Sequence, residues 1–309
     1  MKKKLPKVGE FGLIEKLKKF QRSSTRIVRG IGDDAAVLEL DRRRYQLFTT
    51  DMLVEDVHFL GGVDPAALGH KAMAVNISDI AAMGGRPTFA VVSIGVPSGL
   101  SSRYIEAVYR GMRVCADRFG ASIVGGDTVS ADKLVINVAL LGEVEKGRLV
   151  LRSGARPGDR IFVTGPLGGS LAFGRHLRFA PRLREARFLV ERFRPSAMID
   201  ISDGLAGDLG HILRASGLSA WLDEERIPRR RGVTLEAALR DGEDFELLFT
   251  LSSLKAKKLL ECKSVAKDFN FIDIGEIVAG HPGTRAGGLF LRDRCGIRRA
   301  VEMKGYTHF

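Results

Sequence analysis

The amino-acid sequence predicts an α/β protein, in the broad sense that includes α+β folds, with two mixed domains. Short apolar runs typical of strands alternate with longer segments of helical periodicity in both halves of the chain. A length of 309 residues suits two domains. A stretch rich in turn-forming and charged residues, 152–159, separates the halves. We therefore expect one domain over residues 1–150 and a second over residues 151–309.

The first half is expected to begin with an amphipathic helix over 11–20, because its apolar residues recur at helical spacing. A second helix should begin at Pro65, with Asp64 as its N-cap, and end near residue 84. The other elements expected in this half are strands at 45–50, 89–96, 122–124 and 134–142 and a helix at 101–119.

The second half should begin with a strand at 160–164, which a glycine-rich turn follows at 165–169. A strand at 197–201 then leads into a helix that begins near Asp203. The remaining elements expected here are strands at 219–222, 245–250 and 271–276 and helices near 234–239 and 254–261.

The most informative feature is a set of aspartates beside small residues, most of them directly after an apolar run that predicts a strand. They are Asp33, Asp34, Asp51, Asp79, Asp127, Asp200 and Asp203. Carboxylates gathered at one place repel one another unless a cation lies between them. Their hard oxygens suit Mg²⁺, which usually shares itself with water and substrate phosphates. The pattern therefore predicts a metal–polyphosphate site assembled from distant segments.

The segment 30–35, GIGDDA, matches the dinucleotide-binding pattern by letter. We regard this match as weak, because no strand of sufficient length precedes it and two bare carboxylates would repel a pyrophosphate. An acidic turn is an alternative for this motif alone. The sequence contains neither a Walker A loop nor the protein-kinase motifs. Nucleotide phosphates would therefore be held by metal ions, glycine N–H groups and arginines.

Four further residues are candidates for ligand contacts. Gly126, next to one of the aspartates, would allow a phosphate to approach the backbone closely. Arg152 could clamp a phosphate or serve as a surface ion-pair partner. Ser202 precedes a predicted helix, whose N-terminus favours anions. Glu243 lies in an acidic turn and could face a cationic substrate group or be solvated.

The formal net charge of +12 admits an RNA partner. Much of this charge lies in an arginine-rich stretch at 175–194. We interpret the stretch as a solvated helix face and expect no nucleic-acid partner.

Three cysteines, Cys115, Cys262 and Cys295, lie far apart and lack the spacing of a zinc site or a disulfide framework. No apolar run approaches the roughly 20 residues that a membrane span needs. We therefore expect a cytoplasmic location without membrane attachment. The scarcity of Asn and Gln beside many charged residues also indicates a thermophilic source.

Nine segments carry a resemblance that extends over nearly the whole chain. They are 30–35 (GIGDDA), 49–51 (TTD), 57–59 (VHF), 71–84 (KAMAVNISDIAAMG), 125–128 (GGDT), 152–155 (RSGA), 199–205 (IDISDGL), 242–247 (GEDFEL) and 304–309 (KGYTHF). In this order and spacing they resemble the thiamine-monophosphate kinase family, in the superfamily of aminoimidazole ribonucleotide synthetase. Two residues depart from the family pattern: Phe245 stands where tyrosine is expected, and Asp56 where glycine is expected.

The resemblance implies ATP-dependent phosphorylation of thiamine monophosphate to thiamine diphosphate, and we expect direct in-line transfer without a covalent protein residue. Several Mg²⁺ ions would be bound by Asp34, Thr49, Thr50, Asp51, Asp79, Asp127, Asp200 and Asp203. ATP would be contacted by Tyr104, Gly126, Asp127, Arg152 and Ser202. The substrate would be contacted by His58, Glu243 and Tyr306.

The resemblance also implies a fold of the aminoimidazole ribonucleotide synthetase type and a homodimer whose N-terminal strands pair in a shared barrel. Two other functions stay open at this point. One is another ATP-dependent reaction of the same superfamily, such as that of aminoimidazole ribonucleotide synthetase. The other, more remote, is a basic RNA-binding protein whose acidic turns are merely structural.

Overall fold

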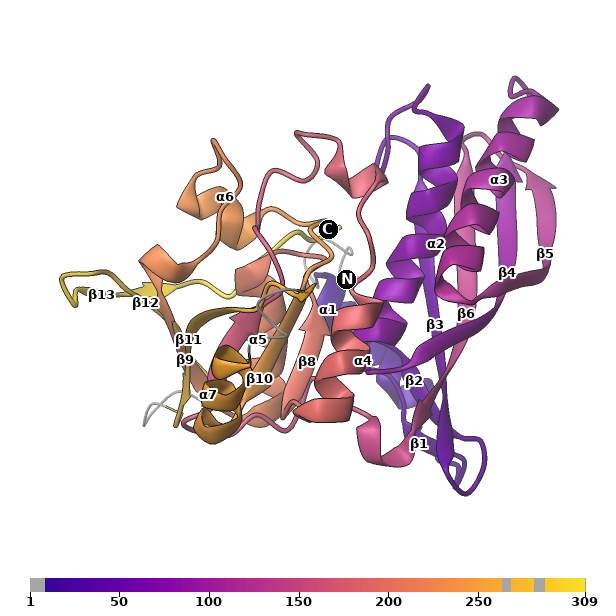
Figure 1. Cartoon of the computed structure of the whole chain (residues 1–309). Helices are drawn as coiled ribbons and strands as arrows, with labels where there is room; N and C mark the ends of the chain where they lie inside the picture. Colours follow the sequence, from indigo (N-terminus) through magenta and orange to yellow (C-terminus); the bar gives the residue numbers. More distant parts are fainter. Residues whose placement is uncertain (1–8, 263–267, 281–286, 309) are drawn as a thin grey trace, which may run out of the picture.

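The computed structural model describes residues 9–262, 268–280 and 287–308. Within this part of the chain the strands form two sheets, one of six strands and one of seven. Helices cover both sheets, and α2 lies between the first sheet and the second half of the chain (Figure 1). The expectation of a mixed α/β architecture is therefore confirmed. The division into domains at residue 150 stays a prediction, although strands of the first sheet all precede residue 146 and those of the second all follow residue 159.

The first sheet has the strand order β1-β2-β3-β6-β4-β5. Its strands are β1 (Ile27–Arg29), β2 (Ala36–Glu39), β3 (Arg44–Val54), β4 (Arg86–Val96), β5 (Ser122–Ser130) and β6 (Val135–Glu145). Neighbouring strands are antiparallel except for the parallel pair β4 and β5. One face of the sheet packs against α2 (Pro65–Ala82). Apolar side chains on exposed sheet positions include Phe48, Met52, Phe89 and Val91.

The second sheet has the strand order β13-β12-β9-β11-β7-β10-β8. Its strands are β7 (Arg160–Val163), β8 (Ala197–Asp200), β9 (Ser219–Asp223), β10 (Leu247–Leu251), β11 (Ile272–Val278), β12 (Leu289–Arg292) and β13 (Arg298–Val301). The α-helices besides α2 are α1 (Glu10–Leu17), α3 (Ser102–Phe119), α4 (Leu183–Arg192), α5 (Leu205–Ser216), α6 (Leu235–Arg240) and α7 (Ser253–Glu261). Short 3₁₀ turns are η2 (Lys18–Phe20), η3 (Lys146–Arg148), η4 (Arg175–Leu177) and η5 (Glu224–Arg226).

Helix α2 begins where the sequence predicts. The Asp64 carboxylate accepts hydrogen bonds from the backbone N–H groups of Ala66 and Ala67, and Pro65 occupies the first turn. The helix is buried on almost every side, as expected for one that is apolar around its circumference. A Cβ on Gly69 would lie 1.9 Å from the Val108 carbonyl oxygen. This glycine therefore lets α2 and α3 approach each other closely.

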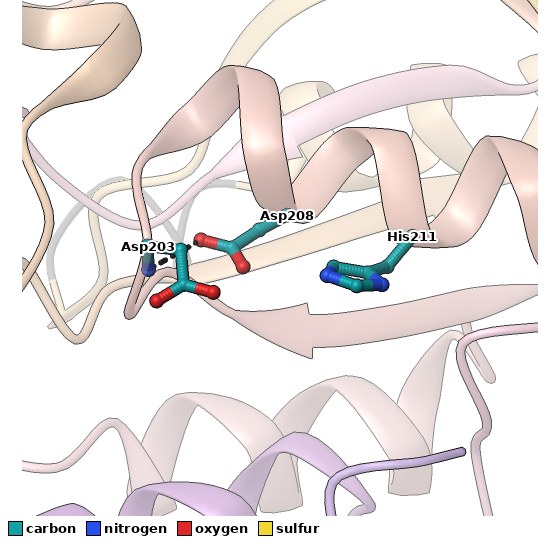
Figure 2. Close-up of side chains that lie close together, drawn as sticks. All are labelled: Asp203, Asp208 and His211. Carbon is teal, nitrogen blue, oxygen red and sulfur yellow. Dashed lines mark hydrogen bonds between the residues drawn. The ribbon is translucent and has the colours of Figure 1, made fainter. Parts of the chain in front are cut away.

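Helix α5 begins two residues after Asp203. The preceding turn is fixed by Asp208, whose carboxylate accepts a hydrogen bond of 3.0 Å from the Asp203 N–H (Figure 2). Asp208 lies in the first turn of the helix, where a negative charge is favoured by the helix dipole.

Several strands differ from those expected. Strands β1 and β2 were not predicted, because three and four residues are too few to show a clear alternation. Strand β3 continues past Asp51 to Val54, and β5 continues through the glycine pair to Ser130. Asp127 therefore lies inside an edge strand and not at a turn.

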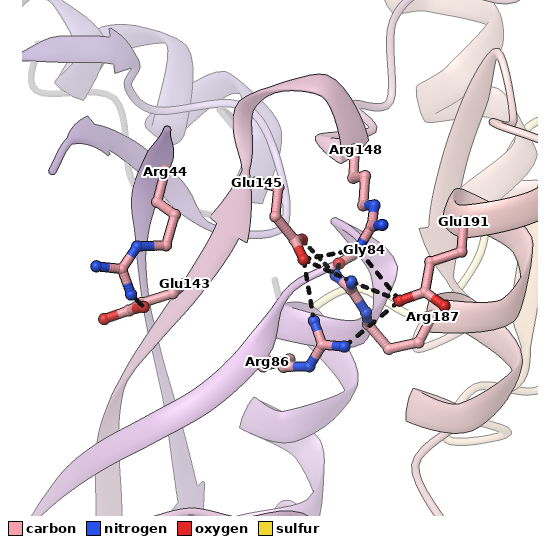
Figure 3. Close-up of polar contacts among 8 residues, drawn as sticks. All are labelled: Arg44, Gly84, Arg86, Glu143, Glu145, Arg148, Arg187 and Glu191. Carbon is pink, nitrogen blue, oxygen red and sulfur yellow. Dashed lines mark hydrogen bonds and ion pairs between the residues drawn. The ribbon is translucent and has the colours of Figure 1, made fainter. Parts of the chain in front are cut away.

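A cluster of charged residues joins the halves of the chain. Arg187, on α4, donates to the Gly84 carbonyl oxygen at 2.6 Å and to the Glu145 carboxylate at 2.9 Å and 3.0 Å (Figure 3). It also pairs with Glu191, one helical turn along α4. Arg86, which also reaches Glu145, is more exposed. The interpretation of the arginine-rich stretch as a solvated helix face is therefore wrong for Arg187.

No helix among the described residues is long and apolar enough to cross a membrane.

Replacing Arg187 with Met should lower the free energy of unfolding by about 2 kcal/mol, because the Gly84 carbonyl and Glu145 lose a buried charged donor. Urea denaturation measures this difference. Arg86→Met is the matched control: its side chain is 55% exposed, and its loss should cost less than about 1 kcal/mol. Equal decreases in the free energy of unfolding for the two variants would contradict the expectation that Arg187 contributes more than Arg86 to the link between the two halves of the chain.

Candidate functional site

A cavity of about 950 Å³ lies between the two halves of the chain. Its lining comes from α1, from the turn before β2, from β3, and from the loops that precede α5 and β10. Candidate residues on this lining are Asp51, His58, Arg152, Ser202, Asp203, Glu243 and Tyr306. Residues far apart in the sequence thus share one cavity.

Four aspartates form what we call the carboxylate cluster: Asp34 and Asp200, which are buried, and Asp51 and Asp79, which are half-buried. Carboxylate oxygens of Asp34, Asp79 and Asp200 all lie within 4.8 Å of one another. Asp51 shares a hydrogen bond with Asp79, so it belongs to the same group. The four come from the turn before β2, from β3, from α2 and from the end of β8.

Neutral side chains orient the cluster. The Thr49 hydroxyl donates to Asp79 and lies 3.2 Å from the Asp34 carbonyl oxygen. The Ser78 hydroxyl donates to Asp200. These hydroxyls satisfy some of the carboxylate lone pairs without contributing positive charge.

Burial and mutual repulsion shift the proton affinities of the cluster. Burial, with the charge of Asp34 adding to it, raises the pKa of Asp200 to about 7. Burial also raises the pKa of Asp51 to about 6, and that of Asp79 well above its usual value with the charge of Asp51 adding to it. Each of these pKa shifts has the same cause: the protein alone does not provide enough positive charge and hydrogen-bond donors to stabilise the ionised carboxylates.

Arg152 is the cation in contact with this cluster. Its Nη2 lies 2.8 Å, and its Nε 3.3 Å, from Oδ1 of Asp34. The backbone N–H of Arg152 donates to Asp33 at 3.1 Å, which fixes the start of the side chain. The second carboxylate oxygen of Asp34, Oδ2, is buried and has no hydrogen-bond partner among the described residues. One acceptor atom of the cluster is therefore left for a ligand.

A second acidic group lies beside the first. Ligand atoms of Asp203, Asp208 and His211 lie within 4.8 Å of one another (Figure 2). Burial, with the positive charge of Arg152 adding to it, lowers the pKa of His211 to about 3, so the ring is neutral. Burial raises the pKa of Asp203 to about 6. The sequence analysis did not single out Asp208 or His211, although their spacing of three on a helix places them on one face.

The candidates for substrate contact lie on another part of the lining. Nδ1 of His58 accepts a hydrogen bond of 3.0 Å from the Val54 N–H, so a neutral His58 carries its proton on Nε2. The ring of His308 lies between those of His58 and Tyr306, with centroids 5.1 Å from each. The backbone N–H of Tyr306 donates to the Asp203 carbonyl oxygen at 2.9 Å. This bond links the C-terminal segment to the acidic groups.

Glu243 is held near a positive charge. Its carboxylate pairs with Lys71 and lies 3.5 Å from Nδ1 of His176. Burial acts to raise the pKa of Glu243, but the positive charge of Lys71 outweighs it, and the pKa is lowered. Glu243 is therefore an ionised carboxylate and not part of a solvated turn.

The two departures from the family pattern have local explanations. Asp56 has φ of 65°, in the left-handed region that favours glycine but that aspartate tolerates. The ring of Phe245 stacks on Phe179 with centroids 4.2 Å apart. The backbone of Phe245 is also left-handed, with φ of 50°, and its N–H donates to the Ile201 carbonyl oxygen at 2.8 Å.

Four candidates lie away from the cluster within this chain. Gly126 and Asp127 are on the edge strand β5, three strands from β3 and thus about 14 Å from Asp51. Thr50 bonds Asn137 on the neighbouring strand at 3.1 Å. The Tyr104 hydroxyl donates to the Val63 carbonyl oxygen at 3.1 Å. A Cβ on Gly126 would lie 1.9 Å from the Val92 carbonyl oxygen. The close approach of β5 to β4 therefore requires a glycine at this position, whether or not a phosphate binds there.

Residues 32–144 match the family model described as AIR synthase related protein, N-terminal domain. The chain is also 37% identical to thiamine-monophosphate kinase of Bacillus subtilis, over 98% of this chain and 100% of the relative. Thiamine-monophosphate kinase of Aquifex aeolicus is 33% identical over 99% of this chain and 100% of the relative.

Solved structures agree with these relatives. AaThiL complexed with AMPPCP and TMP superimposes with a TM-score of 0.85 at 34% identity, covering 100% of both chains. The thiamine monophosphate kinase from Aquifex aeolicus gives a TM-score of 0.78 at 31% identity, over 97% of this chain and 100% of that chain. The hydrogenase maturation protein HypE, at 24% identity and a TM-score of 0.70, shares the fold. The chain therefore belongs to the thiamine-monophosphate kinase family.

Proposed function

We propose that this protein is an ATP-dependent kinase that phosphorylates thiamine monophosphate to thiamine diphosphate. One observation carries the proposal: a single cavity is lined by Asp51 of the carboxylate cluster and by Arg152, and also by His58, Glu243 and Tyr306. The first group suits a polyphosphate with metal ions, and the second suits a cationic aromatic substrate. The full-length similarity to AaThiL complexed with AMPPCP, an analogue of ATP, and TMP supports the same reaction.

We propose that Mg²⁺ is bound by the carboxylate cluster, with Thr49 beside it and Asp203 at its border. The fit rests on the donor set, which consists of hard oxygens, and on the buried Oδ2 of Asp34, which has no partner in the part of the chain that the structure describes. Bound Mg²⁺ supplies positive charge that neutralises both the carboxylates and the phosphates.

Arg152 and Ser202 are suited to ATP phosphates. Both line the cavity beside the cluster. The Arg152 guanidinium is held in place by Asp34 and by the backbone bond to Asp33, so little side-chain freedom is lost on binding. A positioned guanidinium can donate two hydrogen bonds to phosphate oxygens at once.

The substrate candidates match the chemistry of thiamine monophosphate. Glu243 offers a carboxylate to the positive thiazolium, and Tyr306 offers an aromatic face for a cation–π contact. Nε2–H of His58 is free of the Val54 bond and can donate to the substrate. These residues hold the acceptor molecule, while the acidic groups lie on the side of the phosphates.

Positioning and electrostatics are sufficient for the transfer. An oxygen of the thiamine monophosphate phosphate attacks the γ-phosphorus of ATP in line, and the bond to the ADP oxygen breaks as the new bond forms. The attacking oxygen is already ionised, so no protein base has to remove a proton. The chain contributes by aligning two anions that would otherwise repel each other.

We also propose a homodimer in the cytoplasm, with small molecules and no nucleic acid as partners. The exposed apolar positions of the first sheet suit a second copy of this chain. Gly126 and Asp127 lie on the edge strand, too far from the cluster in their own subunit, so a partner could deliver them. Two arginines of the basic stretch, Arg182 and Arg187, are committed to ion pairs with Glu246 and Glu145.

Thiamine diphosphate should form from ATP and thiamine monophosphate, and excess EDTA should abolish its formation, because the cluster loses its counter-charge. Mass spectrometry of the product measures this. Asp79→Asn should lower turnover by a factor of about 100 or more. Asp117→Asn, at a residue that is exposed on α3, is the control and should retain full activity. Transfer that proceeds in EDTA would contradict the proposed role of metal.

The metal-free protein should lose stability as the pH rises. The folded pKa values of Asp51 and Asp200 are raised to about 6 and about 7, so the folded state holds more protons than the unfolded state above about pH 4. This stabilisation is complete below the unfolded pKa and is lost as the pH passes the folded values. MgCl₂ should therefore raise the melting temperature at pH 8 more than at pH 5, in differential scanning fluorimetry. An equal rise at both values would contradict the assignment.

If Asp127 acts across the dimer, two inactive variants should complement each other. In a mixed dimer of Asp79→Asn and Asp127→Asn subunits, one site regains an intact pair, so random mixing should restore about a quarter of the wild-type activity. Reversible exchange of purified subunits, followed by the product assay, tests this. No recovery in dimers shown to be mixed would place Asp127 in its own subunit's site or outside the site altogether.

A further inference from the structure

Lys71 is a fully buried lysine in the N-terminal half of its helix. It lies on α2 with 0% exposure and does not line the cavity. A buried ammonium is stable only where its three donors find acceptors. Here Nζ donates to the His58 carbonyl oxygen at 2.8 Å and to Nδ1 of His176 at 3.0 Å, and it forms an ion pair with the Glu243 carboxylate.

Two of these acceptors belong to segments that carry candidate substrate residues. The hydrogen bond from Lys71 to the His58 carbonyl oxygen holds the loop after β3 in place. The Glu243 carboxylate, which Lys71 also contacts, projects from the loop before β10. Both residues line the cavity, whereas Lys71 lies behind them. One ammonium group thus sets the separation of two substrate contacts that are 185 residues apart in the sequence, from 58 to 243.

The backbone at Glu243 needs such support. Its φ is 67°, a left-handed conformation that is costly for a residue other than glycine. The Glu243 N–H donates to the Ser202 carbonyl oxygen at 2.7 Å, and the Phe245 N–H donates to the Ile201 carbonyl oxygen at 2.8 Å. These bonds fix the main chain of the loop. The direction of the carboxylate is set separately, by Lys71.

His176 completes the arrangement from a third segment. It lies on η4, is 7% exposed, and accepts from Lys71 because an ammonium has only donors to offer. Its Nδ1 also lies 3.5 Å from the Glu243 carboxylate. With His176 in place, the Lys71 side chain cannot turn away from Glu243 without losing an acceptor.

We infer that Lys71, supported by His176, is a positioning residue for substrate: it aims the Glu243 carboxylate and fixes the His58 loop so that both meet the cationic ring of thiamine monophosphate. This inference rests on the proposed function. The alternative is that Lys71 merely neutralises a buried carboxylate and so contributes to stability alone. The two differ in what happens to substrate affinity when the protein stays folded.

Lys71→Met should raise KM for thiamine monophosphate about tenfold or more, because Glu243 loses its orienting partner, while KM for ATP stays within about twofold. His176→Leu should raise the same KM several-fold, and His176→Asn should restore it, because the Asn amide oxygen can replace Nδ1 as the acceptor. Steady-state kinetics with each substrate varied, together with melting curves, give both readouts. Arg187→Met is the matched control: it removes another buried cation between the halves, and should lower stability without changing KM.

Three results would overturn the inference. Lower melting temperatures for Lys71→Met and His176→Leu with an unchanged KM for thiamine monophosphate would leave only a structural role. Equal KM values for His176→Leu and His176→Asn would show that the acceptor atom of His176 does not help to position the substrate. If Lys71→Met does not fold, this result alone would overturn the inference. Failure of the unmodified protein to phosphorylate thiamine monophosphate would instead overturn the proposed function, and the inference with it.

Discussion

Repulsion among closely spaced carboxylates is the constraint on which this structure depends. Asp34, Asp51, Asp79 and Asp200 approach from separate segments, and Arg152 compensates only part of their charge. Hydroxyl groups and a rigid surrounding core keep the carboxylates together although their charges favour separation. A cation that binds there relieves this repulsion. The affinity of the site for metal ions and the raised pKa values of its carboxyl groups in the absence of metal therefore have the same cause.

Helix α2 carries residues that contact both the carboxylate cluster and the substrate candidates. Along one face, Lys71 reaches the Glu243 carboxylate, Ser78 reaches Asp200, and Asp79 joins the cluster. The spacings of seven and eight residues place these side chains on the same face of the helix, about two turns apart. The side that suits the acceptor molecule and the side that suits the phosphates are therefore held at a fixed separation by one rigid element.

Much of this arrangement could be predicted from the sequence, for identifiable reasons. Asp200 follows a clear apolar run and ends β8, as the sequence pattern predicts, and the Asp64-Pro65 pair marks the start of α2. Asp51 also follows an apolar run, but β3 continues beyond it to Val54. Other features depend on tertiary contacts that leave no local signal. A lysine in an alanine-rich helix is usually solvated, and nothing near Lys71 in the sequence indicates that its partners come from residues 176 and 243. Asp127 resembles the other aspartates by letter, but the strand around it is longer than its apolar run.

The burial of α2 has one more consequence, for the variation that the chain can tolerate. An insertion or deletion of one residue between Lys71 and Asp79 would rotate one end of the helix by about 100° relative to the other. Lys71 and Asp79 could then no longer face their partners together, and the glycine contact with α3 would be lost at one end. A substitution that leaves the length of α2 unchanged affects one contact at a time. An insertion or deletion instead displaces every contact on one side of it relative to those on the other side. Across relatives, the length of this helix should therefore drift far less than the lengths of the surface loops.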